Sequence, residues 1–336
     1  MLGSGISPVP GAEAKSPDAD GSSGHVAALY HDASEYVRFV RAFAVDGEAA
    51  DDPLFVAVAG GSMQQVRQVL DGRRGPAAFH DVTELGRNPA RIIPAAQSFA
   101  GQHSGRRVRC IWEPAWPQRS AAEFCAVTRH EAVANLALDP AMVSVLCPYD
   151  AAALPPRVIS EARCTHPEVL DSGRRQASPD YLGPACVPPS CLRPLVPPPA
   201  HAERLVYDTK LRPVRALVAA EATRAGLSAG QCSDLVLAVG ELAANTLRHT
   251  GAAGTLHAWH TAREVLCQVH DNGTIADPLA GFRREPPDAA GGHGLWLVNQ
   301  LCDLVELRTG QQGEGTTIRV HMLRRSGKQN PVPRLS

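Results

Sequence analysis

The chain has 336 residues, enough for two ordinary domains, and 44% of them are hydrophobic, which suits globular packing. Its formal net charge is -1, so overall charge gives no reason to expect a nucleic-acid partner. No apolar run approaches the roughly 20 residues that a membrane helix needs, so we expect no membrane association.

Residues 1–24 contain no basic stretch followed by an apolar core, so we expect a disordered leader rather than a secretory signal. The nine cysteines form no C-x-x-C pair, which favours reduced thiols and a cytoplasmic location. Cys186 and Cys191 are spaced like half of a metal site, but no partner cluster accompanies them in the sequence, so we favour a structural role.

From residue 25 to residue 170, helical and strand patterns alternate. Strands that alternate with helices predict a mostly parallel sheet covered on both faces. The expected helices span residues 32–49, 62–72 (capped by Ser62) and 120–139, and the expected strands span residues 53–61, 106–113 and 142–150.

Residues 171–202 are crowded with prolines, which remove amide donors and disfavour helix, so we expect a stiff extended linker. A second domain follows over residues 203–325, and residues 326–336 are a polar tail. Its expected helices lie within residues 211–227, 232–250 and 294–303, and its strands within 254–260, 264–273, 304–309 and 315–323. This order predicts an α/β sandwich with helices on one face of a mostly antiparallel sheet.

The helix over residues 232–250 carries an unexpected polar pair. Glu241 and Asn245 are four residues apart and therefore lie on one helix face, beside an apolar stripe. The pair alone is consistent with the solvated edge of an amphipathic helix. The motifs further along the chain favour a functional site instead.

Three glycine-containing motifs follow this helix. In "DNG", Asp271 ends a strand and Gly273 permits close approach of a flat base, although the same residues also suit a plain turn. In "GGHGLWLV", glycines precede an apolar helix, whose N-terminus favours phosphate without any lysine. "GEGTTIRV" leads into the last strand. No G-K-[ST] phosphate loop is present, since only Lys328 follows a glycine and it lies in the tail.

In this order, "ELAAN", "DNG", "GGHGLWLV" and "GTT" resemble the N, G1, G2 and G3 boxes of the GHKL, or Bergerat-fold, ATPases, over about a third of the chain. The family includes histidine kinases and anti-sigma-factor serine kinases. The resemblance implies ATP and Mg²⁺ as cofactors. It places Asn245 on Mg²⁺ through its amide oxygen and makes Glu241 a general base near the terminal phosphate.

The same resemblance implies the remaining nucleotide contacts. Asp271 would accept a hydrogen bond from the adenine amine, and Gly273 would lie beside the ring. Gly292 and Gly294 would form the phosphate loop, and Thr316 would assist adenine recognition. Residues 277–291 would be the nucleotide lid, in which Arg283 and Arg284 either reach phosphates or are simply solvated.

The branch of the family is suggested by what precedes the ATPase motifs. A histidine kinase needs a helical hairpin with an acceptor His there, and the prolines before Glu203 forbid one. The short lid and "GLWLVNQLCDLVELR" resemble the anti-sigma-factor serine kinases. That branch implies a sigma factor or an anti-anti-sigma protein as partner, and leaves open whether the chain forms a homodimer.

A decoy lies in "RHEAVANLAL", where His130-Glu131 mimics an acceptor box and Glu131-x-x-x-Asn135 mimics an N box. No glycine boxes follow it at suitable spacing. We therefore interpret this segment as a structural helix.

The first domain resembles a second family. The segments "LGRNPARIIPAAQSF", "WEPAWPQRSAAEF", "RHEAVANLAL" and "LCPYDAAALPPRVISEARCTHPEVL" are similar to the MEDS sensory domain, over residues 25–170. This resemblance implies a three-layer, RecA-like α/β core without the phosphate-binding lysine, and sensing of an unidentified small molecule. The candidate pocket residues, each with a competing structural interpretation, are His31, Glu113, Trp116, Tyr149 and Asp150.

The leading hypothesis is thus a cytoplasmic signal-transduction regulator, in which a sensory domain is coupled to an ATP-dependent serine/threonine kinase of the anti-sigma-factor type. One alternative is a non-catalytic module whose output is partner binding. Another is a sensor histidine kinase that acts on a separate protein.

Overall fold

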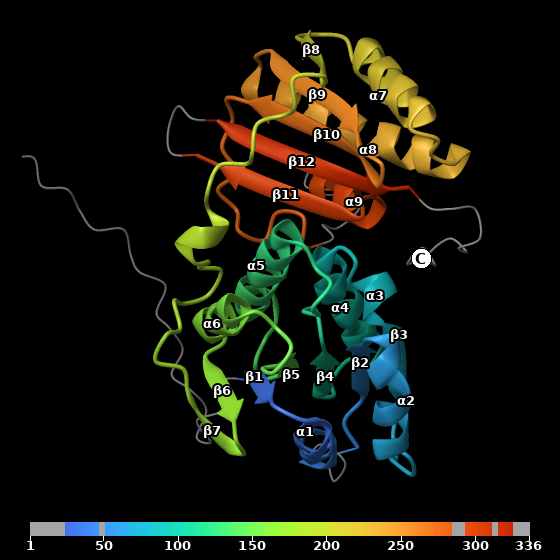
Figure 1. The fold of residues 1–336 in the computed structure, drawn as a ribbon. Helices are drawn as coiled ribbons and strands as arrows, with labels where there is room; N and C mark the ends of the chain where they lie inside the picture. Colours follow the sequence, from blue (N-terminus) through green and yellow to red (C-terminus); the bar gives the residue numbers. More distant parts are fainter. Residues whose placement is uncertain (1–23, 47–50, 284–292, 311–314, 325–336) are drawn as a thin grey trace, which may run out of the picture.

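The computed structural model describes residues 24–46, 51–283, 293–310 and 315–324. These residues form two domains that lie one above the other in Figure 1, each built on its own sheet. Residues 1–23 of the predicted leader and 326–336 of the predicted tail lie outside these ranges. Within them, no helix is both long and apolar enough to cross a bilayer.

The first domain contains a seven-stranded sheet with the strand order β3-β2-β4-β5-β1-β6-β7. Neighbouring strands pair in parallel except β6 and β7, so the prediction of a mostly parallel sheet is confirmed. The strands are β1 (His25–Tyr30), β2 (Leu54–Val58), β3 (Ala77–Asp81), β4 (Val108–Trp112), β5 (Val143–Asp150), β6 (Glu168–Asp171) and β7 (Arg174–Ala177).

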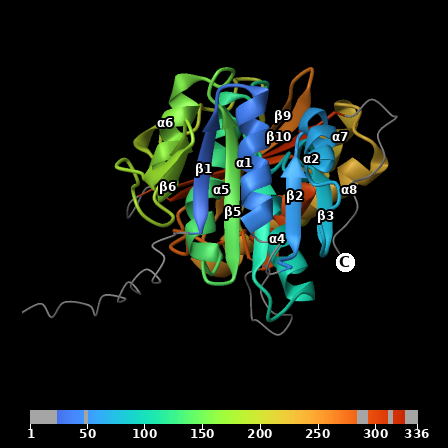
Figure 2. The same cartoon turned by 90° about the horizontal axis from the view of Figure 1, so that it is seen from below.

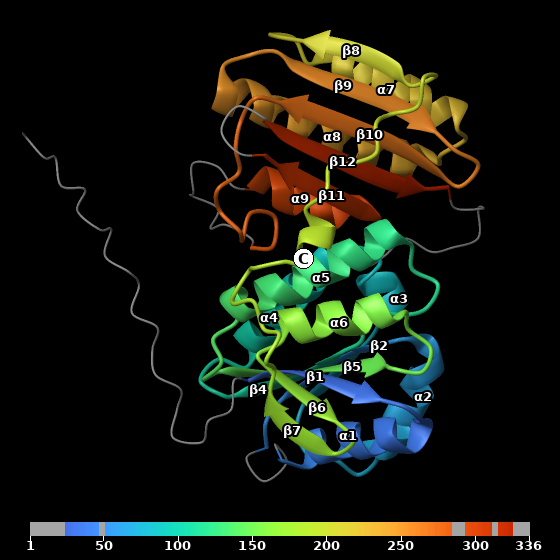
Figure 3. The same cartoon turned by 60° about the vertical axis from the view of Figure 1, so that its left-hand side comes forward.

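Helices cover both faces of this sheet (Figures 2 and 3). Successive side chains of β2 point to opposite faces of the sheet, and both faces are apolar: Leu54 and Val56 pack in one core, whereas Phe55 packs in the other. Each face therefore needs a layer of helices to cover it. One layer holds α1 (Ala33–Asp46) and α2 (Gly60–Val69). The other, which faces the second domain, holds α3 (Val82–Leu85), η1 (Pro89–Arg91), α4 (Ile92–Gln102), α5 (Ala121–Ala137) and α6 (Pro156–Thr165).

The start of α2 differs from the prediction. We expect Ser62 to cap this helix, but α2 begins at Gly60, and its N-cap, Ala59, makes no side-chain hydrogen bond. The Ser62 amide instead donates to the Ala59 carbonyl at 2.8 Å, within the first turn. The prediction is wrong because Gly60 and Gly61, which we expect to end the strand, form the first two residues of the helix.

The first sheet continues past Leu170, the last residue that we assign to the sensory domain. Ser172 and Gly173 have φ angles of 50° and 77°, the left-handed pair of a tight hairpin turn, and they reverse the chain into β7. The linker that follows contains one short helix, η2 (Pro189–Cys191), in which Cys191 is buried beside Cys125 of α5. The linker boundaries otherwise stay a prediction.

The second domain contains a five-stranded antiparallel sheet with the order β11-β12-β10-β9-β8. Three helices, α7 (Arg212–Arg224), α8 (Ala229–Thr250) and α9 (His293–Leu301), pack on one face around a common core. The predicted α/β sandwich is confirmed. The strands are β8 (Glu203–Tyr207), β9 (Gly254–His260), β10 (Glu264–Asp271), β11 (Leu304–Thr309) and β12 (Thr316–Leu323).

The proline-rich linker crosses the other face of this sheet on its way to β8 (Figure 1). Arg308 donates from Nε to the Arg193 carbonyl at 2.7 Å, and Arg319 donates from Nη2 to the Val196 carbonyl at 2.5 Å. Because proline lacks an amide donor, the linker adds no strand here, and arginine side chains hold its carbonyls instead.

Helix α8, which carries the first ATPase motif, has capping residues at both of its ends. Ser228 and Gln231 form a capping box, in which each side chain accepts the other residue's amide hydrogen. Gly251 ends the helix with a left-handed φ of 61°. These signals fix the boundaries of the 22-residue helix and hence the positions of Glu241 and Asn245.

A buried ion cluster in the second sheet predicts a pH-dependent stability. His321 lies 3.0 Å from Glu264 and 3.0 Å from Glu306. Burial alone would lower the pKa of His321, but the hydrogen bonds to both carboxylates raise it to about 9. Because the folded pKa exceeds the unfolded value, the stabilisation is complete below the unfolded pKa and is lost as pH rises through about 9.

We therefore expect His321→Gln to lower the free energy of unfolding by about 3 kcal/mol at pH 6, and the difference from the wild type to shrink towards pH 9.5. Urea unfolding across this range measures it. His201→Gln, at an exposed position of the linker, is the control and should change little. A difference that stays constant with pH would contradict the assignment.

Candidate functional site

A cavity of about 440 Å³ lies in the second domain, between α8, the carboxyl end of β10 and the start of α9. Apolar side chains from α8, β10 and β12 form part of its wall, and the segment after β10 closes another side. Its size is in the range of small-molecule and cofactor sites. The described lining residues include Leu242, Asn245, Val269, Asp271, Gly273, Leu279, Gly281, Arg283, Gly294, Thr316 and Ile318.

Asp271, the last residue of β10, is held at both carboxylate oxygens. Oδ2 accepts the Thr246 hydroxyl at 2.7 Å, and Oδ1 accepts the Gly273 amide at 2.8 Å. The Tyr207 hydroxyl donates to Thr246 at 3.1 Å, and Thr316 donates to the Gly273 carbonyl at 2.8 Å. The carboxylate is therefore fixed as an acceptor at the cavity wall.

The start of α9 comes close to Asn245 of α8. A Cβ atom at Gly294 would lie 2.7 Å from Asn245 Nδ2, so only glycine fits at this position without displacing the amide. Asn245 Oδ1 accepts a hydrogen bond from Arg248 at 3.0 Å. The glycine thus lets the N-terminus of α9 and the Asn245 amide line one cavity.

The structure brings together five of the seven predicted site residues: Asn245, Asp271, Gly273, Gly294 and Thr316 all line the cavity. Glu241 lies half-buried one turn before Asn245 on α8, but does not belong to the described lining. Gly292 lies outside the described residues. The roles assigned to all seven remain predictions.

The beginning of the predicted lid is anchored in the first domain. Phe282 is 5% exposed and packs in the core of the first domain, where the Arg129 guanidinium lies 5.7 Å from its ring centroid. Leu279 packs on the same core and also lines the cavity. Arg283 lies 3.8 Å from Asp277, whereas Arg284 lies outside the described residues.

The first domain also binds the C-terminal end of α9. Arg91 of η1 is buried and donates to the Asn299 carbonyl at 2.9 Å and to the Cys302 carbonyl at 2.6 Å. Asn88 donates to Asn299 Oδ1 at 3.0 Å, and Asn299 Nδ2 donates to the Gly281 carbonyl at 3.0 Å. Through Asn299, contacts from the first domain reach both α9 and the start of the lid.

The candidate pocket residues of the first domain divide between its core, which holds Tyr149, and the carboxyl edge of its sheet, where His31 follows β1, Glu113 follows β4 and Asp150 ends β5. Tyr149 is buried and its hydroxyl lies 3.4 Å from Glu131, whereas His31 is half-exposed, 3.5 Å from Asp171. Asp150 accepts backbone amides of the following turn, and Trp116 stacks on Arg119. Each of these contacts is consistent with a structural role.

Glu113 is the fifth candidate, at the carboxyl end of β4. Its side chain is buried, and burial raises its pKa to about 7. The Ala59 amide lies 3.4 Å from Oε2, at the start of α2. A carboxyl group that titrates near neutral pH at the carboxyl edge of a parallel sheet is a suitable polar contact for a ligand.

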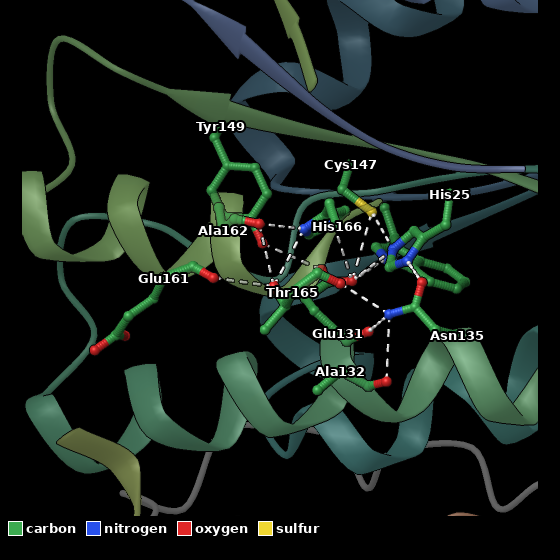
Figure 4. Close-up of polar contacts among 11 residues, drawn as sticks. His25, Glu131, Ala132, Asn135, Cys147, Tyr149, Glu161, Ala162, Thr165 and His166 are labelled. Carbon is green, nitrogen blue, oxygen red and sulfur yellow. Dashed lines mark hydrogen bonds and ion pairs between the residues drawn. The ribbon is translucent and has the colours of Figure 1, made fainter. Parts of the chain in front are cut away.

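Sequence reasoning missed another group. His25, Glu131, Cys147 and His166 meet in the core of the first domain, as Figure 4 shows, and Asn135 contacts His25. The interpretation of the decoy segment as a helix is correct, since it forms part of α5. Nothing in the spacing of these residues indicates that they meet, because they come from β1, α5, β5 and the residue after α6. The half-site suggested by Cys186 and Cys191 contributes to no such group within the described residues.

Two known families match the chain. Residues 24–167 match the family model of MEDS, the MEthanogen/methylotroph, DcmR Sensory domain. Residues 207–322 match the model of the histidine kinase-like ATPase domain. No curated protein matches the chain. The chain therefore carries these two domains in the order that the motifs predict, and its second domain has the Bergerat fold.

The geometry of Asp271 predicts a loss of nucleotide binding in Asp271→Asn. An amide cannot accept at both positions that the carboxylate now uses, and a charge-assisted hydrogen bond to the adenine amine is lost. We expect Mg-ATP affinity to fall about 10- to 100-fold, measured by calorimetry on the full chain. Asn272→Ala, at the exposed neighbouring position, should retain it. Equal affinities in wild type and Asp271→Asn would rule out this role.

Proposed function

We propose that this chain, a MEDS domain followed by a histidine kinase-like ATPase domain, is a signal-transduction regulator in which the sensory domain controls an ATP-dependent protein serine/threonine kinase of the anti-sigma-factor type. The observation that carries the proposal is the cavity lined by Asn245, Asp271, Gly273, Gly294 and Thr316. These residues come from all four ATPase motifs of the sequence.

The cavity fits an adenine nucleotide with Mg²⁺. Asp271 offers a fixed carboxylate to an exocyclic amine, and the absence of a side chain at Gly294 keeps the α9 N-terminus open beside Asn245. Asn245 offers a hard oxygen ligand of the kind that Mg²⁺ prefers. Bound Mg-ATP supplies the phosphoryl group and the positive charge that its transfer requires.

The protein's own groups would then assist transfer in two ways. Glu241, one helical turn before Asn245, would take the proton of the attacking hydroxyl as a general base. Backbone amides at the start of α9, together with the helix dipole, would stabilise negative charge on the phosphate oxygens.

Two features favour a hydroxyl on another protein as the acceptor. Between β7 and β8, where the structure describes every residue, η2 is the only regular element, so this segment holds no helical hairpin with an acceptor His directly before the ATPase domain. His130, in the segment that mimics an acceptor box, is 0% exposed. A buried ring cannot receive a phosphoryl group without unfolding of α5.

Signal transfer would use the contacts between the domains. Arg91 and Asn88 bind the end of α9, and Phe282 joins the lid to the sensory core. A ligand-induced shift in the α4–α5 layer would therefore move both the phosphate-binding helix and the lid. The partner would be a sigma factor or an anti-anti-sigma protein in the cytoplasm, as the family resemblance implies.

A second candidate function is a non-catalytic, ATP-dependent binding module. The position of Glu241 favours it, because this side chain is absent from the described lining of the cavity. In that case the output of ATP binding would be partner binding alone.

A phosphorylation assay separates these functions. We expect the full chain with labelled ATP to transfer an acid-stable label to a candidate anti-anti-sigma protein. Glu241→Ala should keep Mg-ATP binding and lose about 10²- to 10⁴-fold in rate, because it removes a base. Asn245→Ala should lose Mg-dependent binding, and Ser233→Ala, exposed on the same helix, should behave as wild type.

The other outcomes have defined meanings. Acid-labile label on this chain would replace the serine/threonine assignment with a histidine kinase. No label anywhere, with a partner still bound in the presence of ATP, would identify the non-catalytic module.

The coupling between domains is testable by amide hydrogen exchange. Because coupling is reciprocal, Mg-ATP should slow exchange in residues 86–92 of the first domain. Phe282→Ala should abolish this protection at saturating Mg-ATP, whereas Leu237→Ala, an exposed apolar position on α8, should keep it. Exchange in residues 86–92 that does not respond to Mg-ATP in the wild type would show that the interface does not transmit the signal.

A further inference from the structure

Four side chains from distant parts of the sequence converge inside the first domain (Figure 4): His25 of β1, Glu131 of α5, Cys147 of β5 and His166, which follows α6. The last three are 0% exposed, and His25 is 5% exposed. One donor atom from each lies within 4.8 Å of all the others. Such a group is able to surround a single ion.

The ring of His25 is oriented by Asn135. The Asn135 amide nitrogen donates to the backbone carbonyls of Glu131 (3.0 Å) and Thr165 (2.8 Å), so its Oδ1 must be an acceptor. His25 Nδ1 lies 2.9 Å from that oxygen and therefore carries the hydrogen. In the neutral ring, Nε2 then points its lone pair into the cluster, 3.0 Å from Glu131 Oε2 and 3.3 Å from Cys147 Sγ.

The ring of His166 is fixed in the same way. Its Nδ1 lies 2.8 Å from the Ala162 carbonyl, which can only accept, so Nδ1 carries the hydrogen. Nε2 is buried, 3.5 Å from Glu131 Oε2, and has no hydrogen-bond partner within the described residues. A ring nitrogen whose opposite nitrogen donates to a carbonyl is the usual arrangement of a metal-binding histidine.

The carboxylate is oriented as well. Trp112 Nε1 donates to Glu131 Oε2 at 3.3 Å, and the Tyr149 hydroxyl lies 3.4 Å from Oε1. Two imidazole lone pairs, a carboxylate oxygen and a sulfur thus face one another in a site without access to water. Such an arrangement is unfavourable unless a cation, either protons or a metal ion, lies among them.

The distances suit a metal ion. Zn–N and Zn–O bonds of about 2.0–2.2 Å and a Zn–S bond of about 2.3 Å give separations of roughly 3.3–3.7 Å between tetrahedral ligands. Glu131 Oε2 lies 3.5 Å from both Cys147 Sγ and His166 Nε2, and Cys147 Sγ lies 3.3 Å from His25 Nε2, all within this range. The separation of Glu131 Oε2 from His25 Nε2 is shorter, 3.0 Å, and all four ligand atoms lie within 4.8 Å of one another. A carboxylate and a thiolate would also balance a divalent ion, which leaves the buried site neutral.

We propose that His25, Glu131, Cys147 and His166 form a closed, four-ligand site for a divalent transition-metal ion, with zinc as the best match to two imidazoles, a carboxylate and a thiolate. Cys147 binds as the thiolate and releases its proton to solvent when the metal enters. The metal joins β1, β5 and α5. Because α5 also carries Arg129, which lies over Phe282, the site fixes the helix that contacts the lid.

The test uses the full-length protein, first freed of metal and then incubated with Zn²⁺ or Co²⁺ alone. We expect about one tightly bound zinc per chain by elemental mass spectrometry, a higher melting temperature with Zn²⁺, and thiolate-to-metal charge-transfer absorption with Co²⁺. Asn135→Ala, which leaves all four ligands in place, should weaken Zn²⁺ binding about 10- to 100-fold.

Matched variants assign the metal to this cluster. Cys147→Ser should lose the Co²⁺ absorption and the thermal shift, whereas Cys110→Ser and His130→Gln, also buried in this core but outside the cluster, should retain both. The proposal fails if the wild type binds no stoichiometric zinc and its melting temperature is the same with and without Zn²⁺. Protons would then be the only cations in the cluster. It fails equally if folded Cys147→Ser keeps the Co²⁺ absorption. If Cys147→Ser does not fold, the Co²⁺ spectrum of the wild type is the test: thiolate-to-metal absorption supports the proposal, and its absence contradicts it.

Discussion

The carbonyl groups at the C-terminal end of α9 impose the constraint on which the two-domain arrangement depends. The last carbonyls of a helix have no partners within it, and burial without partners is costly. Arg91 of the first domain donates to the Asn299 and Cys302 carbonyls and Asn88 to the Asn299 carbonyl, and the Arg91 charge also complements the helix dipole. The Asn299 and Cys302 carbonyls therefore have these partners only when the two domains are docked.

This constraint extends to the candidate nucleotide site because α9 is short. Its nine residues span about 13 Å, so the domain contact at one end lies close to the cavity at the other. The same interface buries Phe282, just after the lid residues that line the cavity. Under the proposed function, a sensory domain in this position would act on the candidate phosphate-binding helix and on the lid together, without a separate signalling element.

Helix α5 connects the two sites of the molecule. Glu131 faces the sheet of the first domain and belongs to the buried polar cluster, whereas Arg129 faces Phe282 of the second domain. The cavity is built from glycines, backbone groups and helix termini that a ligand can approach. The cluster consists of buried side chains held by second-layer hydrogen bonds, which makes it suited to a fixed ion rather than to an exchanging substrate.

That five of the seven predicted site residues line one cavity could be expected from sequence, because the determinants of their positions are local. The Glu241–Asn245 spacing follows from helix geometry, and Asp271, Gly273 and Gly294 lie at element ends that turn residues mark. Their order then identified the fold, and the alternation of helices and strands identified the parallel sheet. Tertiary structure alone decided three things: that Glu241 stands apart from the described cavity lining, that Phe282 is buried in the other domain, and that His25, Glu131, Cys147 and His166 meet. The physical reason is that parallel strands and domain docking bring together residues more than a hundred positions apart, and no local periodicity records such contacts.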